Sequence, residues 1–314
     1  MPAALDAKTP QGRAVAGLIW SFTGLCTAIW LLVLIGLAVA LWRRRALRAD
    51  PLKIDLRAER RAGTVVGVLV ALTGVIVIGL TVLSYAAQSQ LFAPEPGALS
   101  IDVVGHQWWW EVVYNSPDPS QTLTTANEIH VPVGRPVTLN LSSTDVIHSF
   151  WVPSLMGKAD LIPGRHNDLT FTADKPGVYN GTCAEFCGLQ HAHMGIRVVA
   201  QSVADFDAWR SGQLQPAASP ATRSAEAGEA VFQSSACALC HTVAGTPAGG
   251  QVGPDLTHLA SRSSLAAGTL DLGRGQLAAW IADPQGIKPG AKMPDIRLSP
   301  DRLNALVDYL MGLK

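Results

Sequence analysis

Residues 183–194 read Cys-Ala-Glu-Phe-Cys-Gly-Leu-Gln-His-Ala-His-Met, and they place two thiols, an imidazole and a thioether in one short stretch. Thiolate and thioether donors select soft or borderline metals such as copper. Two cysteines four residues apart in a loop can bridge a pair of ions, with His191 and Met194 completing opposite ends. A symmetric site needs a second imidazole, and His148 in the run Asp-Val-Ile-His-Ser-Phe-Trp (145–151) is the candidate.

Two other interpretations of these cysteines explain the motif less well. Cys183 and Cys187 could form a disulfide in an oxidising compartment, but a disulfide would not explain the histidine and methionine at these offsets. A zinc site would leave Met194 unexplained, because zinc takes thiolate, imidazole and carboxylate ligands. The sequence therefore favours copper.

A second cofactor motif lies near the C-terminus, where residues 237–241 read Cys-Ala-Leu-Cys-His. This spacing is the attachment signature of a c-type haem, with Cys237 and Cys240 bound covalently and His241 on the iron. A thioredoxin-like motif would need a βαβ context, and a zinc site would need a second ligand pair nearby. Met293, in Lys-Met-Pro, is the predicted second axial ligand. Met311 competes with it but falls in a predicted terminal helix.

Two long segments without charge predict a membrane anchor. No Asp, Glu, Lys or Arg occurs in residues 14–42 or 63–94, and each stretch exceeds the roughly 20 residues that cross a bilayer. Buried helices of a soluble protein rarely run so long without charge. We place the spans at about 14–42 and 63–91.

The loop between the two spans is basic and predicts their orientation. By the positive-inside rule it lies in the cytoplasm, so both termini and everything after about residue 95 lie outside. No cleavage-like site precedes the first span, so we expect no removable signal peptide, although a longer precursor stays open. A net charge of zero suggests no nucleic-acid partner. The basic residues of the loop are Arg43, Arg44, Arg45, Arg48, Lys53, Arg57, Arg60 and Arg61.

The remainder of the chain divides by composition into three segments. Runs rich in Val, Ile, Thr and aromatic residues, broken by turn residues, predict short strands of an antiparallel sandwich or barrel in residues 95–202. A helical pattern from Val203 to Gly212 and a Pro/Ala/Ser-rich linker make up 203–224. Helical patterns at 226–234, 274–282 and 299–313 predict a small all-α domain in 225–314.

At this point a family resemblance becomes specific. Residues 14–200 resemble subunit II of haem–copper cytochrome c oxidases, and residues 225–314, with Gly-Pro-Asp-Leu at 253–256, resemble class I cytochrome c. The combination resembles caa-type oxidases. The resemblance implies a two-helix transmembrane hairpin, a cupredoxin-like antiparallel β-barrel and a small all-α cytochrome c domain. The runs that carry the oxidase resemblance are 105–110, 145–155, 160–165 and 183–194.

The resemblance also implies roles for single residues. The metal site would be the dinuclear CuA centre, with Cys183 and Cys187 bridging two coppers. The Glu185 carboxylate would bind magnesium at the contact with subunit I, and Trp108 would be where electrons enter. The chain has Trp109 where the family usually has tyrosine, and Asp145 would belong to an acidic patch that receives cytochrome c. The other implied copper ligands are His148, His191, Met194 and the Glu185 carbonyl.

The implied function is electron transfer within a respiratory enzyme. Electrons would pass from haem c to CuA and on to subunit I, which reduces oxygen to water with proton pumping. The expected partners are subunits I and III, membrane lipid, and either cytochrome c or a quinol-oxidising complex as donor. The expected location is the bacterial inner membrane, with both redox domains on the periplasmic side.

Two alternatives stay open at this stage, an electron-input subunit of a nitric oxide reductase and a stand-alone anchored electron carrier. A nitrous oxide reductase lacks support, because its large catalytic domain has no counterpart here. We interpret the remaining side chains as ordinary: Cys26 as a packing residue of the first span, and His106, His130, His166 and His193 as surface or structural histidines.

Overall fold

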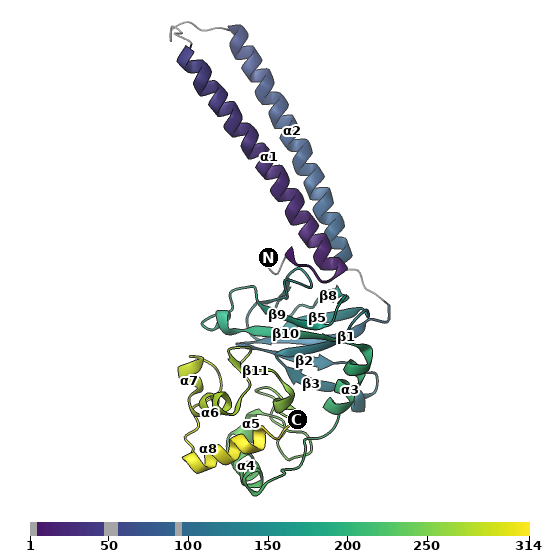
Figure 1. The fold of residues 1–314 in the computed structure, drawn as a ribbon, viewed down its shortest axis with the longest axis vertical. Helices are drawn as coiled ribbons and strands as arrows, with labels where there is room; N and C mark the ends of the chain where they lie inside the picture. Colours follow the sequence, from purple (N-terminus) through teal and green to yellow (C-terminus); the bar gives the residue numbers. More distant parts are fainter. Residues whose placement is uncertain (1–4, 47–55, 92–95) are drawn as a thin grey trace. The chain divides into compact units, whose positions relative to one another are not determined.

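The computed structural model describes residues 5–46, 56–91 and 96–314. The chain divides into two units, of which residues 13–90 form one and residues 91–314, with the N-terminal segment, form the other. Each unit is described by itself (Figure 1).

The first unit consists of two long helices, α1 (Pro10–Ala46) and α2 (Leu56–Leu91). Both are long and apolar enough to cross a membrane. Their large aliphatic side chains are exposed around the helices instead of along one face, as expected of helices whose solvent is lipid. Cys26 in α1 is exposed in the isolated chain. Much of the basic loop between the helices, residues 47–55, lies outside the described residues.

The second unit begins with a β-sandwich of two five-stranded sheets, in the orders β3-β2-β1-β5-β8 and β4-β10-β9-β6-β7. Most neighbours are antiparallel, as predicted, but β1 pairs with β5, and β10 with β4, in parallel. The sheets are therefore mixed. Their strands are β1 (Leu99–His106), β2 (Trp109–Tyr114), β3 (Leu123–Ala126), β4 (Glu128–Pro132), β5 (Val137–Ser143), β6 (His148–Trp151), β7 (Ala159–Leu161), β8 (Asn167–Phe171), β9 (Gly177–Cys183) and β10 (Gly195–Gln201).

Alternation along the strands builds the core of this sandwich. Successive side chains of a strand point to opposite faces, and in β1 the residues Ile101 and Val103 are fully buried while their neighbours are not. The same alternation occurs in β2 and β5. The inward side chains of both sheets form one cluster with Trp110 and Phe150 at its centre. These two rings meet edge to face, with centroids 5.7 Å apart.

Helix α3 (Val203–Gln213) closes the sandwich at the position predicted from the sequence. Ser202 caps it by accepting a hydrogen bond from the Asp205 N–H, which satisfies one of the free donors of the first turn. Its Trp209 stacks on His130 at a centroid distance of 4.1 Å. His130 is buried, so it is a structural histidine and not a surface one.

The C-terminal domain is helical. Its helices are α4 (Arg223–Ser234), α5 (Cys237–Cys240), α6 (Arg274–Ala282), α7 (Pro284–Ile287) and α8 (Pro300–Leu310), with a small hairpin of β11 (Ser264–Leu265) and β12 (Leu270–Asp271). Helices α4 and α8 pack against each other (Figure 1). Gly228 in α4 lets them approach closely, because a Cβ there would lie 1.9 Å from the Ala305 carbonyl oxygen.

This crossing yields a stability prediction. Gly228→Ala should destabilise the C-terminal domain by about 1–3 kcal/mol, since an added methyl in a tightly packed contact forces the backbones apart. Gly275→Ala is the matched control: Gly275 is a helical glycine of α6 in the same domain, and a Cβ added there would meet nothing within 4 Å. Denaturant unfolding of both variants measures the effect. Equal stability of the two variants would contradict the tight crossing.

Candidate metal centre and haem pocket

Strand pairing closes the loop that carries the Cys183–Met194 motif. Strand β9 ends at Cys183 and β10 begins at Gly195, and the two strands pair antiparallel. The Cys183 N–H donates to the Met194 carbonyl over 3.0 Å, so the two ends of the loop face each other. Strand β6 pairs with β9 on the other side, with Phe150 opposite Cys183. His148, the first residue of β6, is thereby brought to the loop.

The side chains predicted as ligands meet around the two thiols. The Sγ atoms of Cys183 and Cys187 lie 3.8 Å apart, and both cysteines are free, not joined in a disulfide. His148 Nδ1 lies 3.9 Å from Cys183 Sγ. On the other side, His191 Nδ1 lies 3.6 Å and Met194 Sδ 3.9 Å from Cys187 Sγ. Two sulfurs in the middle with an imidazole at either end fit a pair of bridged soft ions.

The charge of the two thiols also favours a bound cation. A hydrogen bond from Cys187 lowers the pKa of the Cys183 thiol, and His148 adds to this effect. The same pairing raises the pKa of Cys187, and burial raises it further. Two buried thiolates at this separation repel each other, so both can be ionised only when a positive ion lies between them.

Neighbouring residues fix the orientation of His148. Its Nε2 lies 2.9 Å from the Asp145 carboxylate, which leaves Nδ1 for the sulfur side. Asp145 also accepts from the Gln107 N–H over 2.7 Å. Gly105 leaves room for the ring, because a Cβ there would lie 2.8 Å from His148 Cδ2. Asp145 therefore orients the imidazole, the arrangement that tunes ligand histidines in metal sites.

Glu185 and Trp108 border the same loop. The Glu185 carbonyl lies 3.2 Å from Cys183 Sγ, while its carboxylate points outward and contacts the Lys158 ammonium at 3.3 Å. The Trp108 indole donates to the Cys187 carbonyl over 3.0 Å. Its ring is buried, with 9% of the residue exposed.

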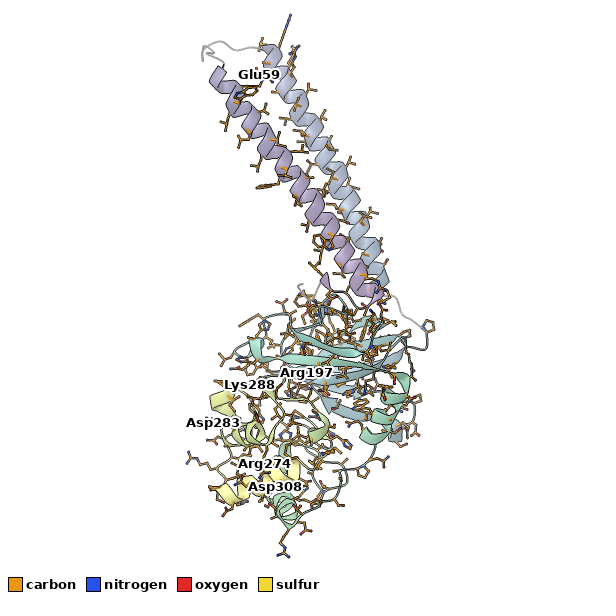
Figure 2. All side chains as sticks on the ribbon, viewed as in Figure 1. Glu59, Arg197, Arg274, Asp283, Lys288 and Asp308 are labelled. Atoms are coloured by element: carbon orange, nitrogen blue, oxygen red, sulfur yellow. The ribbon has the colours of Figure 1, made fainter. Side chains whose placement is uncertain are left out.

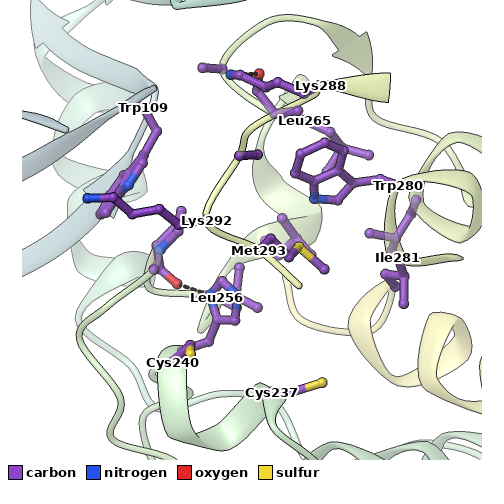
Figure 3. Close-up of a pocket in the computed structure, with 18 of the residues that line it drawn as sticks. Trp109, Cys237, Cys240, Leu256, Leu265, Trp280, Ile281, Lys288, Lys292 and Met293 are labelled. Carbon is purple, nitrogen blue, oxygen red and sulfur yellow. Dashed lines mark hydrogen bonds between the residues drawn. The ribbon is translucent and has the colours of Figure 1, made fainter. Parts of the chain in front are cut away.

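The second motif lies at the bottom of an apolar pocket (Figure 3). Helix α5 presents Cys237 and Cys240 on one turn, and His241 follows at its end. His241 Nδ1 lies 2.7 Å from the Pro254 carbonyl, which can only accept, so Nδ1 carries the proton and Nε2 is left with a lone pair. Burial lowers the pKa of His241 and keeps the ring neutral. A neutral imidazole held in this way is suited to bind iron.

Met293 lies on the other side of the pocket from the two cysteines (Figure 3). Trp280 and Ile281 of α6 form a further wall. Met311, the competing candidate, follows α8 and packs against the core of the domain, and it is not among the residues that line the pocket. The structure thus favours Met293 over Met311 as the side chain facing His241.

The pocket also contains a buried guanidinium that is only partly satisfied, since the Arg262 Nη2 donates to the Asp255 carbonyl. The Nε atom of Arg262 is buried and has no hydrogen-bond partner among the described residues, and Arg262 lines the pocket. A buried polar group without a partner costs free energy. A carboxylate of a bound molecule, such as a haem propionate, would satisfy it. Apolar walls, paired thiols, an imidazole and this guanidinium together fit a covalently bound haem.

Comparison with known proteins agrees with both sites. Residues 116–203 match the family model of the cytochrome c oxidase subunit II periplasmic domain, and residues 225–314 match that of cytochrome c. Cytochrome c oxidase subunit 2 of Alkalihalophilus pseudofirmus is 32% identical over 99% of this chain and 90% of its own length. The chain belongs to the cytochrome c oxidase subunit II family.

Other relatives of this family match parts of the chain. Cytochrome c oxidase subunit 2 of Bacillus subtilis is 33% identical over 69% of this chain and 63% of its own length. A crystal structure of the periplasmic domain of subunit II from Bradyrhizobium japonicum is 32% identical, with a TM-score of 0.36, and covers 38% of this chain and 95% of that one. The family matches and the observed elements confirm the predicted fold class, an apolar helix pair with a cupredoxin-like β-domain and a small cytochrome c domain, except that the sheets are mixed where an antiparallel barrel was predicted.

Sequence reasoning missed several residues of the metal centre and of the haem pocket. Asp145 was assigned to a docking patch, but its carboxylate is mostly occupied by His148, Gln107 and Val146. Arg262 gave no signal, because a lone arginine in a loop is usually solvated. Gly105 stood inside a quoted run, and its lack of a side chain was the only hint. Of the other predicted ordinary histidines, His106 contacts the Glu111 carboxylate, His193 contacts the Gln190 amide and His166 is exposed.

The close approach of Gly105 to His148 yields a prediction for the metal centre. Gly105→Ala should displace the imidazole and weaken copper binding by about 10–100-fold, the usual effect of disturbing the residues behind a ligand. Gly212→Ala is the control, since a Cβ added at Gly212 would meet nothing within 4 Å. Copper titration of both folded variants measures the change in copper affinity. Unchanged affinity in Gly105→Ala would contradict this role of His148.

Proposed function

We propose that this subunit II carries electrons from a covalently attached haem c to a dinuclear copper centre, and from there to the haem–copper centre of subunit I. The observation that carries the proposal is the position of Trp108. It hydrogen-bonds the carbonyl of Cys187 and also lines the haem pocket. One side chain therefore connects the two sites.

The proposed copper ligands are the residues gathered around the two thiols. Cys183 and Cys187 would bridge two ions, His148 and His191 would each bind one, and Met194 and the Glu185 carbonyl would be weak ligands. When bound, the paired ions share one unpaired electron, which spreads the change of geometry between oxidation states. The strands β6, β9 and β10 hold the donor atoms on a rigid base, so little movement accompanies each electron.

The proposed haem ligands come from the C-terminal domain. Cys237 and Cys240 would hold the porphyrin by thioether bonds, and His241 Nε2 and Met293 Sδ would bind the iron. Histidine–methionine ligation raises the haem potential into the range of electron-transfer proteins. Arg262 would bind a propionate and keep that side of the pocket from water.

The outward Glu185 carboxylate suits a contact with subunit I. We propose that it binds magnesium there, with Lys158 as its partner until the ion is present. The orientation proposed from the basic loop puts both redox domains on the periplasmic side of the inner membrane. Subunit III and an external donor, either cytochrome c or a quinol-oxidising complex, complete the proposed assembly. The corresponding division of the chain is 1–94 anchor, 95–202 copper domain, 203–224 connection and 225–314 haem domain.

Rapid mixing of the purified oxidase complex with a reduced donor tests the proposal. Haem c should be reduced first and the copper centre second, and the complex should then consume oxygen. If the copper centre is reduced before haem c, the order of transfer is wrong. If the complex consumes nitric oxide but not oxygen, the oxidase assignment is wrong and the reductase alternative is correct.

The bridging position of Trp108 yields a further prediction. Trp108→Phe should slow transfer from haem to copper by about ten-fold, because the indole loses its hydrogen bond to the Cys187 carbonyl and the geometry of the route loosens. Trp209→Phe is the control, since Trp209 belongs to the same domain but packs on His130, outside the pocket. Flash photoreduction of the haem measures the rate. Equal rates in both variants would remove Trp108 from the route.

A further inference from the structure

Lys288 lies buried where the C-terminal domain meets the β-sandwich (Figure 2). It directly follows α7, beside Pro289 and Gly290, in a sequence context typical of a solvated loop. Only 2% of the residue is exposed. Its Nζ donates to the carbonyls of Trp108 over 2.8 Å, His193 over 2.7 Å and Ala266 over 2.8 Å.

These three carbonyls come from both domains. Trp108 lies in the turn between β1 and β2, and His193 belongs to the loop that carries the copper-ligand motif. Ala266 belongs to the C-terminal domain. An ammonium group has three N–H donors and no acceptor, so the three carbonyls satisfy it completely. Separation of the domains would remove two of the three.

The backbone around Ala266 is held in an unusual conformation at the same contact. Ala266 and Ala267 have φ angles of 51° and 58°, a region that non-glycine residues seldom adopt. This conformation aims the Ala266 carbonyl at Lys288 and the Ala267 carbonyl at the Gly195 N–H, 2.8 Å away. Gly195 permits the approach, since a Cβ there would lie 3.0 Å from the Ala267 oxygen.

Further polar contacts join the two domains. The Gln190 amide donates to the Pro289 carbonyl over 2.8 Å, and the buried Glu128 carboxylate accepts from Ser263. Arg197, labelled in Figure 2, pairs with Asp271 at 3.3 Å. The domains therefore meet through several polar contacts, and Lys288 adds three hydrogen bonds from a buried side chain.

The same contact covers Trp108. Gly290 lies over its ring, because a Cβ at Gly290 would lie 3.5 Å from the indole Cη2. A Cβ at Gly188, in the loop of the β-sandwich, would lie 3.2 Å from the indole Cζ2. One glycine from each domain thus lies close to the ring, which is buried. An external protein cannot reach Trp108 while this contact persists.

We propose that Lys288 is a positioning residue that locks the haem-bearing domain onto the copper-bearing domain and closes Trp108 to any second cytochrome. The proposal rests on the proposed function for its meaning in electron transfer, but the lock itself involves no cofactor. Lys288 acts through the backbone of Trp108 and His193 and touches neither set of proposed ligands directly.

Lysine acylation of the full-length chain, read by mass spectrometry, tests the lock without any activity measurement. Lys292 is the internal control, four residues away with 58% of its side chain exposed. Lys288 should react about ten-fold or more slowly than Lys292, because its labelling requires the domains to open. Equal reactivity of the two lysines in the native chain would overturn the lock.

A matched pair of variants tests the consequence. Lys288→Met keeps the length of the side chain but removes all three donors, and Lys175→Met, at an exposed lysine of the β-sandwich, is its control. In Lys288→Met, transfer from haem to copper should slow by about ten-fold and become sensitive to solvent viscosity, because the domains must then meet by diffusion. The optical spectrum of the haem and the paramagnetic spectrum of the copper should stay unchanged.

The outcomes separate the lock from the proposed function. A merely structural role of Lys288 inside the C-terminal domain would alter the haem spectrum and leave the rate independent of viscosity, which would contradict the proposal. An unchanged transfer rate in Lys288→Met would contradict it as well. If the chain bound no copper or no haem, the proposed function would fail, while the acylation ratio would still decide whether the lock exists.

Discussion

Two buried thiols 3.8 Å apart are the constraint on which the account of this chain depends. Repulsion between thiolates prevents both from ionising without a cation, so the arrangement is either a reduced thiol pair or a metal site. An imidazole beside each sulfur and a thioether beside one of them favour soft metal ions. The carboxylate of Asp145 and the open space at Gly105 fix one imidazole in place, which a simple thiol pair would not require.

The β-sandwich supplies the rigidity that such a site needs. The motif loop begins at the end of β9 and returns in β10, and the pairing of these strands brings its first and last residues together. The third element, β6, adds His148 from a position 35 residues earlier in the chain. Cys183 and His148 lie at the ends of paired strands, and the short loop from β9 to β10 carries the other candidate ligands. Donor atoms held in this way would change little on electron transfer, as a fast relay requires.

The haem pocket and the copper-ligand loop belong to one unit and share a wall. Trp108 contributes to both, and Lys288 ties its backbone to the C-terminal domain. A chain that carries donor and acceptor on docked domains replaces a collision between two proteins by an event within one molecule. Ala266 and Ala267 adopt their unusual backbone conformation at this contact. This indicates that the fold of the C-terminal domain favours its docking on the β-sandwich.

Much of this could be predicted from sequence, and the exceptions have physical reasons. Short-range motifs such as Cys237–His241 place their chemistry within one helical turn, so spacing alone identifies them. Helix α6 was predicted at its observed bounds because residues 276–282, after Gly275 in its first turn, contain neither glycine nor proline. The break between β1 and β2 gave no sequence signal, because the turn at Gln107 and Trp108 contains neither glycine nor proline.

Contacts between segments that are distant in the chain could not be predicted from the sequence. The parallel pairing of β1 with β5 depends on how two sheets close over a shared core, which local alternation does not encode. Nothing in the sequence distinguishes Lys288, because its three acceptors are backbone carbonyls that belong to segments up to 180 residues away. Every residue has a backbone carbonyl, so no residue type in the sequence marks the carbonyls that accept hydrogen bonds from Lys288.

Metal analysis of the purified full-length chain, together with its electron paramagnetic resonance spectrum, tests the central claim most directly. The account predicts about two copper ions per chain, coupled to each other and lost together in Cys183→Ser or Cys187→Ser. A chain free of copper, in which Cys183 and Cys187 are oxidised to a disulfide after isolation under native conditions, would contradict it.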